Sequence, residues 1–177
     1  MLTILEGPDC SGKSTLARRL QRRCRYTCSI IHQGPYREDV ITETLSSVMT
    51  GNPYHTIADR LHLGERVYGP VFRGHDLLGN ARHRIVARIL MSAFNPVQVI
   101  CLPPWETVSG HWFARKDREM LADLEQLESV YEGFVNVVRY IPTVEYDWTT
   151  KNTWELNTEL QSIRTPDNQG PGAGWWE

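Results

Sequence analysis

The fold is decided by a run near the start of the chain, Leu2-Thr3-Ile4-Leu5-Glu6-Gly7-Pro8-Asp9-Cys10-Ser11-Gly12-Lys13-Ser14-Thr15. The first four of these residues form a short apolar run that is typical of a buried parallel strand. Gly7 to Ser14 matches the phosphate-binding pattern G-x-x-x-x-G-K-[ST] without a mismatch, and residues 13–24 have helical composition. A strand, a glycine-containing turn and a helix in this order predict a loop that binds phosphate groups.

Each residue type in this loop has a physical role. The glycines allow backbone conformations and close approaches that a Cβ atom would block, so successive N–H groups point at phosphate oxygens. The amino end of the following helix faces the same anion. Lys13 then reaches the β- and γ-phosphates, and the Ser14 hydroxyl ligates Mg²⁺. We therefore predict ATP (or a close relative) and Mg²⁺ as cofactors, bound by Gly7, Cys10, Ser11, Gly12, Lys13, Ser14 and Thr15.

Short apolar runs alternate with helical segments along the rest of the chain. Further strands are expected over 29–31, 54–58, 97–102 and either 136–141 or 143–146. Helices are expected over 38–49, 61–68, 80–93 and 153–163, with a long helix or a helix pair over 108–134. This alternation predicts an α/β fold with an open, parallel five-stranded sheet flanked by helices. We expect one domain over 1–163, followed by an irregular Gly- and Pro-rich tail over 164–177.

Composition narrows the class of protein. The 177 residues are 41% hydrophobic, which is enough for one packed core, and the net charge of −2 does not indicate a whole-surface grip on nucleic acid. The four cysteines lack zinc spacing, and we interpret them as reduced thiols. No apolar run approaches the roughly 18 residues that span a bilayer. We expect a soluble, cytoplasmic protein without a membrane partner.

The run from Ile4 to Thr15 resembles the opening of thymidylate kinases, which typically read E-G-x-D-x-x-G-K-S-T. The resemblance implies a P-loop NTPase fold of the nucleoside-monophosphate-kinase type. Asp9 stands where the family has an Asp that faces the acceptor sugar; an Asx turn that stabilises the loop is the alternative. Asp59-Arg60 stands where the family has an Asp near Mg²⁺ and an Arg that holds the acceptor phosphate. A simple salt bridge is the alternative for this pair.

Residues 58–74 resemble the family segment that contacts the thymine ring. Tyr68, Arg73 and Gly74 correspond approximately to family positions, and Phe72 is interpreted either as a base-stacking residue or as part of the core. Gly69 replaces a family Gln that helps to read the pyrimidine edge. The resemblance therefore does not imply specificity for thymine.

The Leu102-Pro103-Pro104 turn resembles a V-P-P turn that precedes the mobile lid of the family. The resemblance implies a lid region at about 105–120, whose cations neutralise charge on the transferred phosphoryl group. The candidates are Arg115, Lys116 and Arg118, and a solvated helix face is the alternative. The R-E-P-G segment of the family is absent, and Arg37 is a loose candidate for its arginine.

These residues together predict an ATP- and Mg²⁺-dependent phosphotransferase. The expected catalytic residues are Lys13, Asp59, Arg60, Arg115 and Arg118. The expected acceptor-binding residues are Asp9, Arg37, Arg60, Tyr68, Phe72 and Arg73, and the expected metal ligands are Ser14 and Asp59. The leading hypothesis is a deoxynucleoside monophosphate kinase, whose acceptor is a small nucleotide.

Three alternatives remain open. One is a deoxynucleoside kinase, and another is a kinase that phosphorylates the hydroxymethyl group of a modified pyrimidine, such as 5-hydroxymethyluracil, in phage DNA. A P-loop NTPase switch is less well supported, because the chain lacks the guanine-reading N-K-x-D motif. A DNA acceptor would be favoured by Gly69, by Trp175-Trp176 as stacking residues, and by the run Arg18, Arg19, Arg22, Arg23 and Arg25. A solvated helix face is the plainer interpretation of that run.

Two further expectations concern context. The resembled family is usually dimeric, which implies a homodimer. The compact, divergent chain is similar in style to nucleotide kinases of bacteriophages, which would place the protein in the host cytoplasm.

Overall fold

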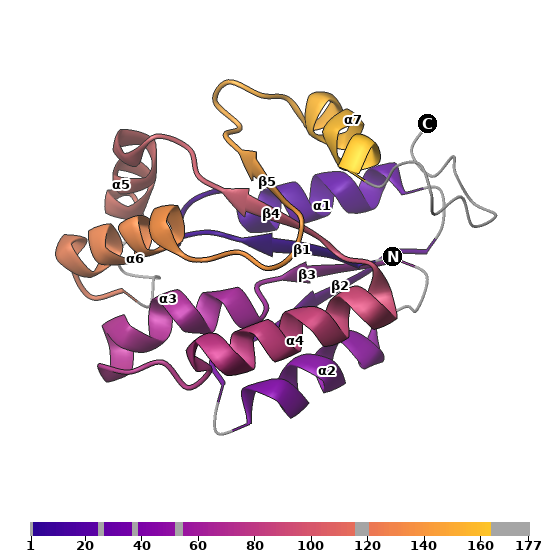
Figure 1. Cartoon of the computed structure of the whole chain (residues 1–177). Helices are drawn as coiled ribbons and strands as arrows, with labels where there is room; N and C mark the ends of the chain where they lie inside the picture. Colours follow the sequence, from indigo (N-terminus) through magenta and orange to yellow (C-terminus); the bar gives the residue numbers. More distant parts are fainter. Residues whose placement is uncertain (1, 25–26, 37–38, 52–54, 116–120, 164–177) are drawn as a thin grey trace.

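One parallel sheet organises the molecule. The computed structural model describes residues 2–24, 27–36, 39–51, 55–115 and 121–163 (Figure 1). Five strands pair in the order β2-β3-β1-β4-β5, all parallel. They are β1 (Leu2–Glu6), β2 (Ser29–His32), β3 (Thr56–Asp59), β4 (Val97–Cys101) and β5 (Thr143–Tyr146). The open, parallel five-stranded sheet expected from the sequence is confirmed.

Helices cover both faces of the sheet because its strands are apolar on both sides. In Figure 1, α1 and α7 lie over one face and α2 and α4 over the other. Side chains alternate along β1, so that Leu5 packs with α1 and α7 while Leu2 and Ile4 pack with α2 and α4. The helices bounding these layers are α1 (Lys13–Arg23), α2 (Val40–Thr50), α4 (Gly79–Phe94) and α7 (Thr153–Ile163).

A third apolar cluster joins α3 (His62–Arg73), α5 (Trp105–Phe113) and α6 (Leu124–Asn136). Its members include Leu63 and Val67 of α3, which share the cluster with Val130 and Phe134 of α6. The helices α3 and α5 follow the strands β3 and β4, so the cluster lies beside the edge where the parallel strands end (Figure 1). The candidate site lies at this edge.

Three sequence expectations are sharpened or corrected. The fifth strand is 143–146 rather than 136–141, and the segment 108–134 contains parts of two helices rather than one.

The expected end of a helix at Gly69-Pro70 is wrong, because α3 continues to Arg73. Pro70 lacks only its own N–H donor, and its carbonyl still accepts from the N–H of Gly74 at 3.0 Å. Gly74 then ends the helix in a left-handed conformation.

Two general features accompany this fold. Cys10, Cys24, Cys28 and Cys101, all within the described residues, form no disulfide bond. Within the described parts of the chain, no helix is both long enough and apolar enough to cross a membrane.

Candidate active site

The loop after β1 takes backbone shapes that require glycine. Gly7 and Gly12 have φ angles of 139° and 90°. A Cβ on Gly7 would lie 2.4 Å from the carbonyl oxygen of Cys101, and one on Gly12 would lie 2.9 Å from Nε1 of Trp148. Since both neighbours are fixed by other contacts, these two positions of the phosphate-binding pattern admit no side chain.

Lys13 is buried at the start of α1. Its ammonium group donates hydrogen bonds to the carbonyl oxygens of Gly7, at 2.9 Å, and Pro8. Burial, followed by the nearby positive charge of Arg60, lowers the pKa of Lys13 below its usual value. Two basic side chains, Lys13 and Arg60, thus lie near the amino end of α1, where a phosphate group is expected to bind.

Ser14 and Asp59 meet although they lie 45 positions apart in the chain. The Ser14 hydroxyl donates to Oδ2 of Asp59 at 2.7 Å, and Nδ1 of His32 lies 3.3 Å from the same oxygen. A hydroxyl beside a buried carboxylate is the pair that holds Mg²⁺ in P-loop proteins. No cluster of three or more His, Cys, Asp or Glu side chains suited to a metal occurs among the described residues. Ser14 and Asp59 offer two oxygen ligands, and Mg²⁺ commonly takes only one or two protein ligands beside water and substrate phosphates.

Arg60 turns the chain sharply after β3. Its φ of 69° is unusual for a side-chain-bearing residue, and its N–H donates to the carbonyl of Leu5 at 2.9 Å. The guanidinium group forms an ion pair with Asp9 and lies 5.0 Å from the centre of the Tyr68 ring. Asp59 and Arg60 thus serve different sides of the site although they are adjacent in sequence.

Asp9 reaches across to Arg60 rather than only stabilising its own loop. Its side chain is buried, and its Oδ2 atom has no hydrogen-bond partner among the described residues. A buried carboxylate oxygen without a donor is costly unless a ligand supplies one. This oxygen is therefore suited to accept a hydrogen bond from a hydroxyl group of a ligand.

Glu6 is a buried carboxyl group that was not among the expected site residues. Its Oε1 accepts the N–H of Leu61 at 2.9 Å, which ties the end of β1 to the residue that follows Arg60. Burial is the main reason that its pKa rises to about 8. The sequence signals for Glu6 were its place at the end of an otherwise apolar strand and its match to the E of the E-G-x-D run.

One cleft of about 360 Å³ brings together the expected catalytic residues that the structure describes. Residues from the loop, the start of α1, the ends of β2 and β3 and the segment after α5 line it, and they include Asp9, Lys13, Ser14, Asp59, Arg60 and Arg115. Two other members, His32 and Gln33, were not expected from the sequence. Arg25, Arg37, Lys116, Arg118 and the tail 164–177 with Trp175 and Trp176 lie outside the described residues, and the expectations for them remain predictions.

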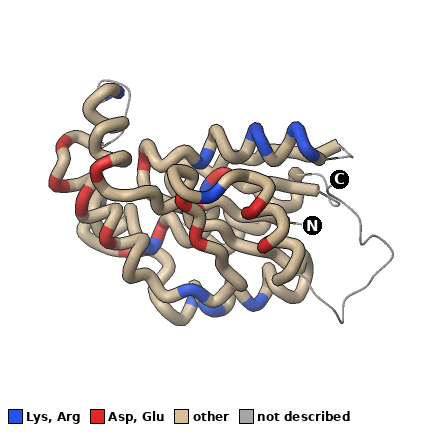
Figure 2. Tube along the Cα trace, turned by 90° about the horizontal axis from the view of Figure 1, so that it is seen from above, with Lys and Arg blue, Asp and Glu red and all other residues tan. Residues whose placement is uncertain are grey.

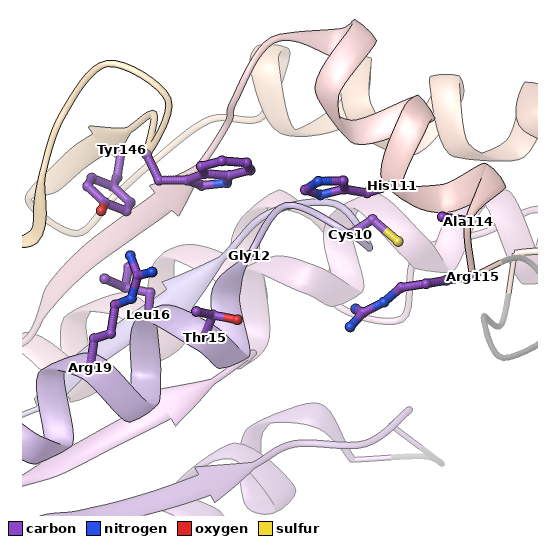
Figure 3. Close-up of a pocket in the computed structure, with 10 residues that line it drawn as sticks. Cys10, Gly12, Thr15, Leu16, Arg19, His111, Ala114, Arg115 and Tyr146 are labelled. Carbon is purple, nitrogen blue, oxygen red and sulfur yellow. The ribbon is translucent and has the colours of Figure 1, made fainter.

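A second pocket, of about 310 Å³, adjoins this cleft on the α1 side (Figure 3). Trp148 forms one wall and donates from its indole Nε1 to the carbonyl of Ser11 at 3.0 Å. The His111 ring lies nearly parallel to the indole, with 5.5 Å between ring centres. Arg19 and Arg115 supply cations to the same pocket. Aromatic walls beside a phosphate-binding loop suit the base and sugar of a nucleotide, and sequence spacing gave no sign of Trp148 or His111.

The opposite side of the cleft leads to a third pocket, lined by Arg60, Tyr68, Phe72, Arg73 and other residues. The Tyr68 and Phe72 rings are stacked, with centres 6.0 Å apart and planes 9° apart. Tyr68 is buried, whereas Phe72 is 39% exposed and is therefore not a core residue. The expected acceptor residues that the structure describes thus lie together in or beside one pocket.

Gly69 is explained by an ion pair in this third pocket. Glu65 pairs with Arg73 and accepts the N–H of Leu77 at 3.0 Å. A Cβ on Gly69 would lie 2.6 Å from Oε1 of Glu65 and 2.9 Å from the carbonyl of His75. The resembled family has a Gln at this place; here the space is taken by a buried carboxylate and a guanidinium group.

Comparison with known proteins finds similar folds among solved structures. No protein-family model matches the chain, and no curated protein is significantly similar to it. The solved structures it resembles include P-loop nucleotide and nucleoside kinases, and at identities of 18% or less this likeness shows the fold alone.

Three of these structures illustrate the likeness. The YorR protein of Bacillus subtilis, in complex with phosphorylated GDP, has a TM-score of 0.72 and 18% identity over 97% of this chain and 100% of that chain. Polyphosphate kinase 2 from Arthrobacter aurescens TC1 has a TM-score of 0.64 and 12% identity, over 97% of this chain and 71% of its own. The deoxyadenosine kinase of M. mycoides, with the products dCMP and dCDP, has a TM-score of 0.56 and 14% identity, over 92% of this chain and 100% of its own.

Proposed function

We propose that this protein is an ATP- and Mg²⁺-dependent kinase that phosphorylates a deoxynucleoside monophosphate. The observation that supports it best is the division of labour between Asp59 and Arg60. Asp59 faces the loop hydroxyl of Ser14 on the donor side, while Arg60 faces Asp9 and Tyr68 on the other side. A carboxylate for the metal and a cation for a second anion, held in one cleft, are what phosphoryl transfer between two nucleotides requires.

On the donor side, the loop amides and Lys13 bind the β- and γ-phosphates, and the pocket of Trp148 receives the nucleoside. Ser14 and Asp59 would hold Mg²⁺, which when bound neutralises charge on the phosphate oxygens. Arg115 lines both the cleft and the nucleoside pocket, so it is placed to contact the transferred group. We assign Arg115 to a lid at about 105–120, with Lys116 and Arg118 as its further cations.

On the acceptor side, Arg60 exchanges its partner Asp9 for the acceptor phosphate. The freed carboxylate of Asp9 then accepts a hydrogen bond from the acceptor sugar. Tyr68, Phe72 and Arg73 contact the base, and Arg37 is a further candidate for the acceptor phosphate. Because a phosphate oxygen is already a competent nucleophile, the reaction needs no strong base.

The comparisons support this proposal at the level of the fold. Two of the structures were determined with nucleotides: the M. mycoides deoxyadenosine kinase with dCMP and dCDP, and YorR with phosphorylated GDP. We further propose one kinase domain over 1–163 with a separate tail over 164–177, a homodimeric assembly, and a cytoplasmic location, in the host if the chain is encoded by a bacteriophage.

A second candidate is a deoxynucleoside kinase. It is favoured by dCMP, a nucleoside monophosphate, among the products bound to the M. mycoides enzyme. A hydroxyl acceptor requires a base, and Asp59 and Asp9 are the carboxylates that line the cleft. The two reactions differ in the acceptor that receives the labelled phosphate: a deoxynucleoside here, and a deoxynucleoside monophosphate in the leading proposal.

One experiment separates the candidates. The protein is incubated with γ-labelled ATP and Mg²⁺ against deoxynucleoside monophosphates, deoxynucleosides, and plain or hydroxymethylated DNA. Label on a deoxynucleoside monophosphate is the expected result. Label only on a nucleoside or only on DNA would replace the proposal by that alternative, and hydrolysis that is independent of any acceptor would indicate an NTPase.

A further inference from the structure

A groove opens from the donor pocket onto the exposed side of α1. It has a volume of about 510 Å³ and is lined by Arg19, Arg22, Arg23, Tyr146, Trp148, Lys151, Asn152 and Thr153. Arg19, Tyr146 and Trp148 also line the donor pocket. The groove is therefore a continuation of the space in which the donor nucleoside is expected to bind.

The charge of this groove is unbalanced. No carboxylate is among the described residues that line it, and its three arginines form no hydrogen bond or ion pair with any residue that the structure describes. Lys151 differs, because it pairs with Glu159. Figure 2 shows the basic positions gathered along α1, in a chain whose net charge is −2. A groove lined by cations without balancing carboxylates indicates an anionic ligand.

The spacing of the cations favours a row of phosphate groups. Thr15, Arg19 and Arg23 are four residues apart and share one face of α1. With a rise of 1.5 Å per residue, Arg19 lies about 6 Å and Arg23 about 12 Å beyond Thr15 along the helix axis. Thr15 itself lines the cleft and the donor pocket. The cations thus run from the phosphate-binding loop toward the far end of α1.

We propose that this groove is an anion subsite that extends the donor site and binds additional phosphate groups of the donor-side ligand. The proposal rests on the proposed function, because it takes the adjoining pocket as the donor site. The same phosphate chemistry has two sources: a linear inorganic polyphosphate, or a nucleoside triphosphate with a further phosphate on its ribose. The acceptor residues Arg60 and Tyr68 line neither the groove nor the donor pocket, so the groove extends the donor side of the cleft rather than the acceptor side.

The test measures binding by isothermal titration with Mg²⁺ present. The ligands are ATP, ATP with a 3′-phosphate, tripolyphosphate, longer linear polyphosphates and a single-stranded oligonucleotide. The wild-type protein should bind at least one of the extended ligands about tenfold more tightly than its shorter counterpart, as expected for about 1.4 kcal/mol from charge-assisted contacts. A gain with the 3′-phosphate of ATP would identify the nucleotide as the source of the phosphates, and a gain with the longer chains would identify inorganic polyphosphate.

A double variant, Arg22→Gln with Arg23→Gln, should lose this gain while its affinity for ATP and its turnover stay unchanged. Arg19 is left intact because it also lines the donor pocket. The matched control is Arg18→Gln with Arg88→Gln, which removes the same charge from exposed positions outside the groove and should keep the gain.

Three results would overturn the subsite. They are no gain from extra phosphates in the wild-type protein, equal losses in the two double variants, or a gain seen only with a single-stranded oligonucleotide. If the wild-type protein does not bind ATP at all, the proposed function is wrong. The titrations with polyphosphate test the groove separately, so the two failures can be told apart.

Discussion

At the scale of single residues, the site depends on polar groups held out of water where β1 and β3 end. Glu6, Asp9, Lys13 and Asp59 are all nearly fully buried. Burial of a charge is costly unless partners compensate it, and here the partners are the loop carbonyls, Arg60 and Ser14. Such a concentration of buried ionisable groups favours function over stability.

Lys13 carries the first prediction at this scale. Lys13→Ala should lower turnover at least about a hundredfold, because Lys13 is the one cationic side chain within the loop from Gly7 to Ser14. The fold should remain, as measured by circular dichroism and thermal unfolding. Arg88→Ala, an exposed change on α4, is the control and should keep full turnover. Normal turnover in the Lys13 variant would rule out the assignment of the loop.

The second prediction concerns the stability contributed by Glu6. Its folded-state pKa of about 8 lies above the ordinary 4.5, so its contribution to stability is fully present below pH 4.5 and is lost as the pH rises through 8. A tenfold change in proton affinity between the folded and unfolded states corresponds to about 1.4 kcal/mol, so the loss should reach a few kcal/mol. Glu6→Gln keeps the shape without the titrating proton and should flatten this decline. Denaturant unfolding of the nucleotide-free protein at pH 6 and 9 measures it, and equal declines in both proteins would contradict the role.

At the scale of elements, α3 has two roles: it packs against α6, and it lines the acceptor pocket. It packs Leu63 and Val67 against α6 and presents Tyr68, Phe72 and Arg73 to the acceptor pocket. Gly69 lies between these tasks, next to the Glu65–Arg73 pair. The element therefore tolerates little change at this one position.

The third prediction compares two helical glycines. Gly69→Ala should lower the free energy of unfolding by about 1–3 kcal/mol, because its Cβ would overlap Glu65 and the His75 carbonyl. Gly110→Ala in α5 meets open space and should raise stability by up to about 1 kcal/mol. Urea unfolding of both variants provides the comparison. Similar effects of the two changes would show that the Glu65–Arg73 pair does not exclude a side chain.

At the scale of the whole molecule, a buried histidine pair lies between α3 and α4. The ring centres of His62 and His83 are 5.2 Å apart, and His83 also contacts the ring of Tyr140 at 4.9 Å. Burial, then the neighbouring His83, lowers the pKa of His62 to about 3; burial, then Arg66, lowers the pKa of His83 to about 4. Both side chains are therefore neutral in the folded protein near pH 7.

The fourth prediction follows from this pair. A base whose folded-state pKa is below 6.5 stabilises the fold fully above pH 6.5, and this stability is lost as the pH falls toward 3, because the unfolded chain takes up the proton. For His62 the loss should amount to a few kcal/mol. Thermal unfolding between pH 7 and 4 measures it. The variant His62→Gln with His83→Gln should show a smaller decline, while His75→Gln, an exposed control, should decline as the wild type does.

The sequence by itself determined the fold class and the phosphate-binding loop, because strand, turn and helix are contiguous and their patterns are local. Resemblance to a kinase family then pointed to Asp9, Asp59 and Arg60, which the structure brings into one cleft with Lys13. The end of α3 was misjudged, since packing on α6 outweighs the local effect of Gly69-Pro70.

Only the tertiary structure decided which side chains line the site. Trp148 contacts Ser11 across 137 positions, and Glu6 meets Leu61 across 55. No local pattern encodes such pairs. Parallel strands end at a common edge only once the sheet has assembled, and that edge gathers side chains from segments far apart in the chain. The same assembly joined the arginines of α1 to the donor pocket, whereas in the sequence they resembled an ordinary solvated helix face.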